Sequence, residues 1–156
     1  MPEREEVALS SSLLLEDQIC FSLYAASRSV TAVYRPLLDR IGLTYPQYLV
    51  MLVLWQDAPR AIKDISAALH LDYGTLTPLL KRLEALGHIE RQRRFDDERT
   101  VTIRLTEGGL TLRSEALDVP IEISRALGLS AAETATLQGL LRRVTASTTE
   151  YAAGRR

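Results

Sequence analysis

The chain has one cysteine, Cys20, and two tyrosines follow it at positions that could serve its chemistry, Tyr34 and Tyr45. A lone thiol cannot close a disulfide within its own chain, so Cys20 is a packing residue, a metal ligand or a reactive centre. A peroxide is attacked by a thiolate, whereas an unperturbed cysteine, with a pKa of about 8.5, is mostly protonated at neutral pH. Two phenolic hydroxyls could stabilise the anion by donating hydrogen bonds to the sulfur. These residue types therefore suit a redox-reactive thiol.

The spacing of Cys20 and Tyr34 decides how they could meet. Apolar positions between residues 13 and 35 predict one long helix that ends near Pro36, with Cys20 near its N-terminal end, where the helix dipole favours a thiolate. The fourteen residues from Cys20 to Tyr34 span about 21 Å along a helix, too far for a contact within one chain. If both residues act on one sulfur, Tyr34 comes from an antiparallel partner chain.

Other interpretations of these residues stay open. Most free cysteines behave as small buried hydrophobes, and tyrosines often lie at the edge of a core with their hydroxyls bonded to the backbone, a role that suits Tyr24 and Tyr48. Metal binding is poorly supported, because His70 and His88 lie far from Cys20 in the sequence and show no ligand spacing. We therefore expect no metal ion and no cofactor.

Composition bounds the class of protein. The 156 residues, 46% of them hydrophobic, are enough for one domain with a real core. The acidic start of the chain does not resemble a signal peptide, and no apolar run approaches the length of a membrane span. With a single cysteine, these features predict a location in the reducing cytoplasm. The net charge of −1 argues by itself against a nucleic-acid partner, but residues 81–104 carry seven basic and five acidic side chains.

Helical periodicity and turn residues divide the rest of the chain into short elements. The residues from Thr44 to Gln47 form a capping-box pattern with proline in the first turn, which predicts the start of a helix. Gly87 lies where a left-handed C-terminal helix cap is expected. The expected segments are a buried helix at 48–55, a short amphipathic helix at about 62–69, a connection at 71–74, a leucine-spaced helix at 76–86, a helix capped by Thr106 that runs to Val119 before Pro120, and a last helix from the capping box at 130–133 to about Ala152.

The period of the hydrophobic pattern changes after Gly87. Ile89 begins one strand, a charged tip follows, and Val101, Ile103 and Leu105 alternate with polar residues in a returning strand. Two helices joined by a short turn and followed by a basic hairpin predict a mainly α protein with a winged helix-turn-helix. We expect that lobe at about 44–106 and dimerisation helices at about 10–40 and 107–152. The same order of elements also occurs in proteins that do not touch DNA.

Several sequence motifs resemble the MarR family of bacterial regulators, and specifically its organic hydroperoxide-sensing, OhrR-like branch. The resemblance covers about four fifths of the chain. The Asp-Asp-Glu-Arg motif of the wing is general to the family, whereas Cys20 with Tyr34 and Tyr45 is specific to the peroxide sensors. The segments that carry the resemblance are Gln18–Phe21, Leu23–Ala25, Tyr34–Asp39, Leu43–Leu49, Gly74–Arg82 and Asp96–Arg99.

The resemblance implies a homodimeric repressor that binds a pseudo-palindromic operator in double-stranded DNA and releases it when Cys20 is oxidised by an organic hydroperoxide. Tyr34 and Tyr45 would be supplied to Cys20 across the dimer. Because the chain has no second cysteine, the oxidised thiol would be capped by a low-molecular-weight thiol as a mixed disulfide. The protein would then be a sensor without a catalytic site.

On the DNA side, the resemblance implies contacts from the second helix of the motif and from the wing. Thr75 and Thr77 suit base edges, Lys81 and Arg82 suit guanine or phosphate, and Arg99 would enter the minor groove. Alternatively, Arg93, Arg94 and Arg104 are only solvated strand residues. The implied DNA-binding residues are Asp72, Thr75, Thr77, Lys81, Arg82, Arg91, Arg93, Asp97 and Arg99.

Two other functions compete with this one. The first is a MarR-type regulator that responds to a small phenolic ligand in the dimer cleft, with Cys20 as a packing residue; it would release DNA without any thiol chemistry. The second is a thiol peroxidase with an incidental winged helix, which would turn over hydroperoxide. The chain has no activating arginine or histidine close to Cys20 in the sequence, which argues against a peroxidase.

Overall fold

The computed structural model describes residues 12–93 and 100–155, in two compact units, Met1–Ala116 and Leu117–Arg156. The described part of the first unit contains a short 3-10 helix at Leu15–Asp17, α1 (Ile19–Asp39), α2 (Tyr45–Gln56), β1 (Arg60–Ala61), α3 (Ile62–Leu69), α4 (Tyr73–Ala85), β2 (Ile89–Arg93), β3 (Val101–Leu105) and α5 (Glu107–Glu115). The second unit contains α6 (Val119–Leu127) and α7 (Ala131–Ala153). The mainly α fold with a small sheet is confirmed.

Helix α1 begins later and ends later than the sequence predicted. Before it, the Gln18 side chain donates hydrogen bonds to the carbonyls of Ser12 and Leu14, and Gln18 itself is extended, so the helix starts at Ile19. At the other end α1 passes through Pro36 and stops at Asp39. The buried Leu38 anchors this last turn, because its carbonyl accepts hydrogen bonds from the backbone N–H groups after the helix.

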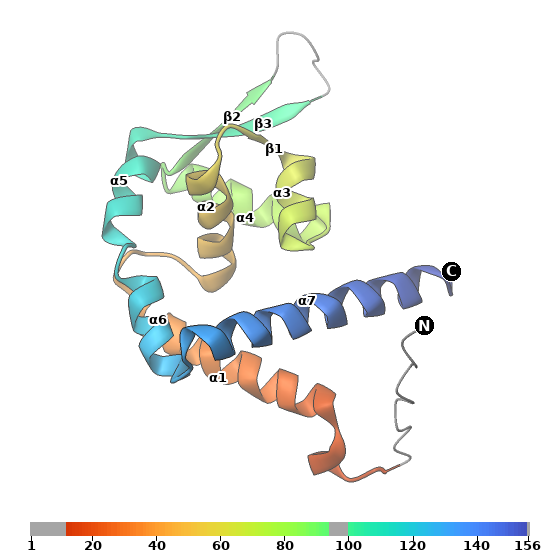
Figure 1. Ribbon diagram of the computed structural model, residues 1–156. Helices are drawn as coiled ribbons and strands as arrows, with labels where there is room; N and C mark the ends of the chain where they lie inside the picture. The colour runs from red at the N-terminus through yellow and green to blue at the C-terminus, as the bar shows by residue number, and fades with distance from the viewer. Residues whose placement is uncertain (1–11, 94–99, 156) are drawn as a thin grey trace. The chain divides into compact units, whose positions relative to one another are not determined.

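Helix α2 starts where the capping box predicted. The Thr44 N–H donates to the Gln47 side chain at 2.9 Å, and the Gln47 N–H donates to the Thr44 hydroxyl at 3.5 Å. Val50, Met51 and Leu54 are almost completely buried, so α2 forms the centre of the core of the first unit. Helices α3, α4 and α5 and strand β3 all pack against it (Figure 1).

The helix-turn-helix consists of α3 and α4. His70 ends α3 in the left-handed region, with φ of 53°, and Leu71 and Asp72 lead into α4. The predicted connection at 71–74 was too long, because Asp72 caps a helix that already begins at Tyr73. Leu76, Leu80 and Leu83 are fully buried, as their spacing predicted.

The wing is part of a three-stranded antiparallel sheet in the order β1-β3-β2. Strands β2 and β3 pair from Ile89 opposite Leu105 to Arg93 opposite Val101, which confirms the predicted strands. Strand β1, which the sequence pattern did not predict, pairs its two residues with Ile103 and Thr102. So short a strand carries no hydrophobic alternation, and only its pairing with β3 defines it.

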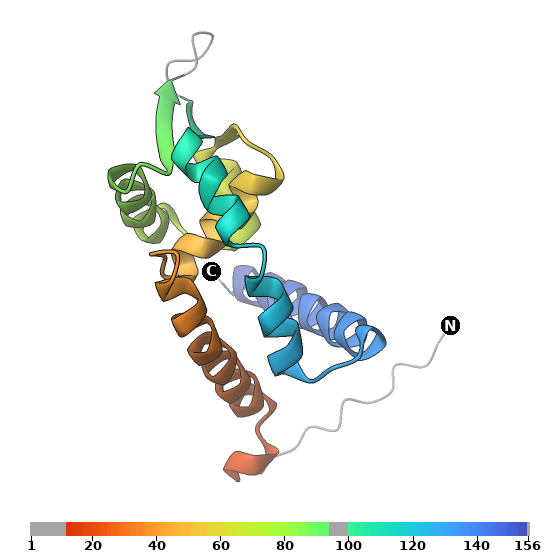
Figure 2. The same cartoon turned by 90° about the vertical axis from the view of Figure 1, so that its left-hand side faces the viewer.

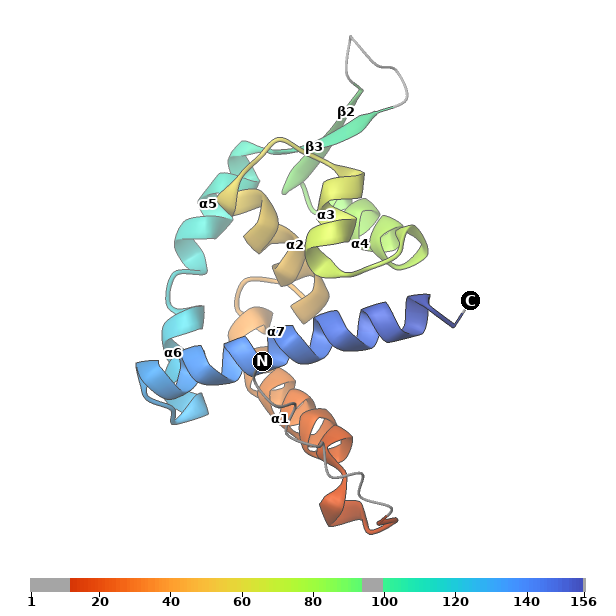
Figure 3. The same cartoon turned by 45° about the vertical axis from the view of Figure 1, so that its right-hand side comes forward.

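The boundary between α5 and α6 lies earlier than the sequence predicted, since the first of these helices was expected to run to Val119. Helix α5 ends at Glu115, and Val119 begins α6 with Pro120 in its first turn, where a missing backbone N–H needs no partner. Helix α7 is long and uninterrupted (Figure 3), and it opens with the predicted capping box of Ser130 and Glu133. Helix α1 leads away from the winged lobe of its own unit (Figure 2).

Candidate functional site

Cys20 is the second residue of α1 and is solvent-exposed. Its thiol lies in the first turn of the helix, where the positive end of the helix dipole favours an anion. The exposure of Cys20 and of its neighbours Ile19 and Phe21 does not fit a buried packing residue within one chain. Cys20 is therefore accessible for oxidation in the single chain.

Tyr34 and Tyr45, which sequence reasoning proposed to act together, are brought together by the fold. The ring of Tyr34, in α1, lies 4.6 Å from the ring of Tyr45, the first residue of α2, centroid to centroid. The capping box that starts α2 at Thr44 holds Tyr45 in this position. Tyr34 and Cys20 stand at opposite ends of α1, so the pair does not reach Cys20 of its own chain.

A third tyrosine, Tyr48, completes the cluster. Its ring lies 5.8 Å from Tyr34 and 6.1 Å from Trp55, and the Trp55 indole donates to the Gly109 carbonyl in α5 at 2.9 Å. The sequence predicted Tyr48 only as a residue at the edge of the core, although its position one turn after Tyr45 on α2 was a signal for the cluster. The tyrosine cluster of Tyr34, Tyr45 and Tyr48 is thus fixed on the winged lobe through Trp55.

The surroundings keep these phenols protonated. Burial, and then the proximity of Tyr45 and Tyr48, raises the pKa of Tyr34 from 10.0 to about 12. Burial also raises the pKa of Tyr45, and burial together with Tyr45 raises the pKa of Tyr48. At neutral pH each hydroxyl carries the proton that a hydrogen bond to an anionic sulfur requires, as an ordinary phenol does, and the raised pKa extends this to more alkaline pH.

The proposed DNA contacts of the recognition helix lie on α4 and differ in their surroundings. Thr75, Lys81 and Arg82 are exposed, and Thr77 is half-buried. Asp72 is the helix cap: its carboxylate accepts from the Thr75 N–H at 2.8 Å, and this hydrogen bond lowers the pKa of Asp72. Asp72 therefore has a structural partner before any DNA is bound.

The two described arginines of the wing are also in different positions. Arg91 of β2 is half-buried and points to Glu84 of α4, with 3.4 Å between its Nε and the carboxylate. Arg93 is exposed at the end of β2. Asp97 and Arg99 lie outside the described residues. Within residues 12–93 and 100–155, no three His, Cys, Asp or Glu side chains are grouped to hold a metal ion, and no helix is long and apolar enough to cross a membrane.

A helix-turn-helix with an exposed basic second helix, followed by a wing, defines a winged-helix DNA-binding regulator. The sequence pattern of the family described as transcriptional regulator SarA/Rot matches residues 32–115. The chain is 52% identical over 116 residues to the organic hydroperoxide resistance transcriptional regulator of Bacillus subtilis (strain 168), covering 74% of this chain and 77% of that protein.

Two solved structures extend the comparison. Reduced AbfR bound to DNA is similar with a TM-score of 0.73 and 36% identity, over 86% of this chain and 94% of that one. A mutant of MarR from E. coli complexed with operator DNA gives a TM-score of 0.77 and 27% identity, over 86% and 99%. The chain belongs to the MarR family of transcriptional regulators, in the branch of the organic hydroperoxide regulators. This family is a class of regulators rather than enzymes, which disfavours the thiol peroxidase.

Proposed function

We propose that this chain is a DNA-binding repressor that senses organic hydroperoxides through oxidation of Cys20 and then releases its operator. The observation that carries the proposal is the contact between the rings of Tyr34 and Tyr45, which stand together on the fold, with Tyr34 fourteen residues along the chain from Cys20 in α1. The name of the Bacillus subtilis relative, an organic hydroperoxide resistance regulator, supports the same function.

The sensor site is assembled between two copies of the chain. Since Tyr34 cannot reach Cys20 along its own helix, an antiparallel partner brings its Cys20 to the tyrosine cluster. Both long helices have apolar side chains that need cover: α7 has no buried residue, and exposed patches of this kind mark interfaces. The exposed apolar residues of these helices are Ile19, Phe21, Tyr24, Val33, Leu137, Leu140, Leu141, Val144 and Tyr151.

The chemistry proceeds in two balanced steps. The Cys20 thiolate, held by hydrogen bonds from Tyr34 and Tyr45, attacks the terminal oxygen of the hydroperoxide; the O–O bond breaks, an alcohol leaves after taking up a proton, and Cys20 becomes a sulfenic acid. A low-molecular-weight thiol then forms a mixed disulfide with Cys20 and releases water. The bulk of the adduct and the lost tyrosine hydrogen bonds shift the dimer to a state that no longer fits the DNA.

DNA binding follows from the winged lobe. Helix α4 enters the major groove, where Thr75 and Thr77 meet base edges and Lys81 and Arg82 meet guanine or phosphate. Arg93 contacts the DNA backbone from the wing. Arg99, with Asp97 as its neighbour in the wing, enters the minor groove. Two residues hold the wing and α4 in place: Arg91 joins β2 to α4 through Glu84, and Asp72 caps α4. The two-fold symmetry of a dimer requires a pseudo-palindromic operator.

The test is operator binding by the reduced protein, before and after cumene hydroperoxide with a small thiol, together with intact mass. Release of DNA with a mass increase on Cys20 is expected, and the Cys20→Ser variant should stay bound. Release from Cys20→Ser under the same conditions would sink the proposal and point to a ligand-responsive regulator. Continuous consumption of hydroperoxide by the protein would instead indicate a peroxidase.

A further inference from the structure

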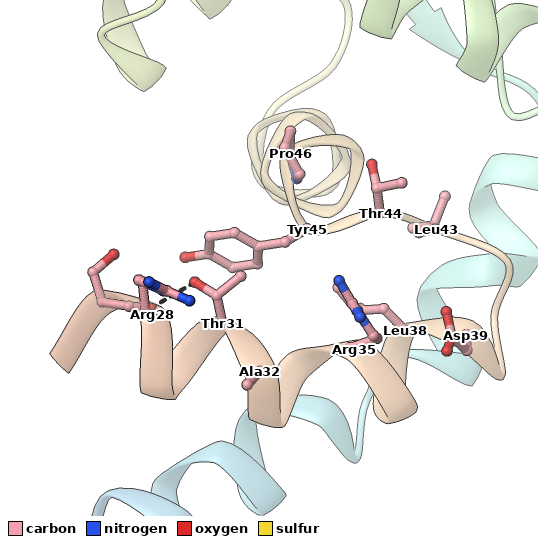
Figure 4. Close-up of a pocket in the computed structure, with 11 residues that line it drawn as sticks. Arg28, Thr31, Ala32, Arg35, Leu38, Asp39, Leu43, Thr44, Tyr45 and Pro46 are labelled. Atoms are coloured by element: carbon pink, nitrogen blue, oxygen red, sulfur yellow. Dashed lines mark hydrogen bonds between the residues drawn. The ribbon is translucent and has the colours of Figure 1, made fainter. Parts of the chain in front are cut away.

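A pocket of about 640 Å³ lies between the middle of α1 and the start of α2, beside the tyrosine cluster. Arg28, Thr31 and Arg35 line it from α1, and Tyr45 lines it from α2. The Tyr45 ring extends across the pocket with its hydroxyl directed toward Arg28 (Figure 4). Pockets of this volume hold small molecules rather than single ions.

The charged side chains of the pocket favour an anion. Two guanidinium groups, of Arg28 and Arg35, line the pocket, against one carboxylate, of Asp39. Tyr24 orients Arg28: the Arg28 Nη1 donates to the Tyr24 hydroxyl at 3.2 Å, and the guanidinium lies 5.5 Å from the centre of the ring. The Arg35 side chain has no hydrogen bond or ion pair with any other described residue, so its five donors are available to a ligand. A planar carboxylate is a group that a guanidinium binds through two parallel hydrogen bonds.

Tyr45 belongs both to this pocket and to the tyrosine cluster. Any small molecule that approaches a sulfur held by the Tyr45 hydroxyl from the pocket side passes Arg28 and Arg35. We propose that the pocket binds the carboxylate of the low-molecular-weight thiol that caps the oxidised Cys20 of the partner subunit. This inference rests on the proposed function, because it needs Cys20 of the partner subunit beside Tyr45.

The capping reaction needs no reagent other than the thiol itself. The incoming thiolate attacks the sulfenic sulfur, the S–O bond breaks as the S–S bond forms, and the hydroxide leaves as water with one proton. The carboxylate of the thiol remains on the arginines, so the adduct bridges α1 and α2 of one subunit and Cys20 of the other. The pocket therefore selects carboxylate-bearing thiols over neutral ones of similar size.

The experiment measures how fast the sulfenic acid of Cys20 in the full-length protein is converted to a mixed disulfide. The protein is oxidised with cumene hydroperoxide and mixed with mercaptopropionate or with mercaptoethanol, and the adduct is followed by intact mass. Each rate is compared between the wild type and Arg35→Gln, because this ratio cancels the intrinsic reactivity of each thiol. Arg113→Gln, which removes an exposed charge from α5 outside the pocket, is the matched control.

We expect Arg35→Gln to slow mixed-disulfide formation with mercaptopropionate by about threefold to tenfold, with little effect on the reaction with mercaptoethanol. This difference should shrink at high salt. Arg113→Gln should leave both rates unchanged. Equal effects of Arg35→Gln on both thiols, or none, would overturn the inference while leaving the sensor proposal intact. If no sulfenic acid forms at Cys20, the proposed function itself is wrong.

A free carboxylate is the other source of the same chemistry, and it is tested separately. Propionate is added to the Cys20→Ser protein bound to its operator. Continued binding is expected, since the pocket serves the thiol that attacks Cys20. Release of DNA by propionate from Cys20→Ser, and not from Cys20→Ser combined with Arg35→Gln, would assign the pocket to a free ligand and overturn the inference.

Discussion

The rings of Tyr34 and Tyr45 lie 4.6 Å apart although one residue stands in α1 and the other begins α2. Two phenols are thereby presented at one place, and in the proposed sensor both donate a hydrogen bond to the Cys20 thiolate. The contact also ties the tyrosine cluster to the winged lobe, because Tyr48 and Trp55 continue it to Gly109 in α5.

Replacing either tyrosine of the pair with phenylalanine should slow oxidation of Cys20. Each change removes one hydrogen bond to the thiolate, which lowers the fraction of thiolate and the rate with cumene hydroperoxide by about tenfold at neutral pH. The measurement is the rate of sulfenic acid formation as a function of pH. Tyr73→Phe, an exposed tyrosine on α4, is the control. Unchanged oxidation in both Tyr34→Phe and Tyr45→Phe would remove the tyrosines from the sensor.

The raised pKa of Tyr34 predicts a loss of stability in alkali. The folded chain holds this proton up to about pH 12, whereas the unfolded chain loses it near pH 10. The stabilisation is therefore complete below pH 10 and is lost as the pH rises toward 12. The urea midpoint should fall steeply over this range in the wild type and less steeply in Tyr34→Phe. An identical slope in Tyr34→Phe and in the exposed control Tyr151→Phe would contradict the assignment.

Because the Thr75 N–H donates a hydrogen bond to Asp72, the role of Asp72 in capping α4 can be tested apart from any role in binding DNA. Asp72→Ala should lower the melting temperature, whereas Asp72→Asn, which can still accept the Thr75 N–H, should not. Because the pKa of Asp72 is lowered from 3.8, the carboxylate contributes to the stability of the folded chain above that pH, and this contribution is lost as the pH falls. Loss of operator affinity in a stably folded Asp72→Asn would show that the carboxylate also contacts DNA.

The two wing arginines should respond differently to salt. Arg93 is exposed, so Arg93→Met should reduce the slope of the logarithm of operator affinity against the logarithm of salt by about one. Arg91 is bound to Glu84, so Arg91→Met should leave this slope close to that of the wild type. Glu84→Gln tests the pair from its other side and should lower the free energy of unfolding by about 0.5 kcal/mol. A full unit of slope lost in Arg91→Met would make Arg91 a phosphate contact.

The local sequence determined most of the helices and both wing strands. The two capping boxes at Thr44 and Ser130 start their helices as predicted, and Gly87 adopts the positive φ of 78° that its cap position required. Short-range hydrogen bonds decide such features, so they can be read from neighbouring residues. The prolines at 36 and 120 misled the prediction of helix ends, since burial and position in the turn decided whether a helix continued.

Only the tertiary structure decided what surrounds each functional side chain. The sequence by itself named Cys20, Tyr34 and Tyr45, but the ring contact of the two tyrosines, the addition of Tyr48 and the pocket beside Arg35 depend on how α2 packs on α1. It likewise could not separate the exposed Arg93 from Arg91, which pairs with Glu84. The type and spacing of residues fix which chemistry is possible, whereas packing between distant segments fixes burial, pKa and hydrogen-bond partners.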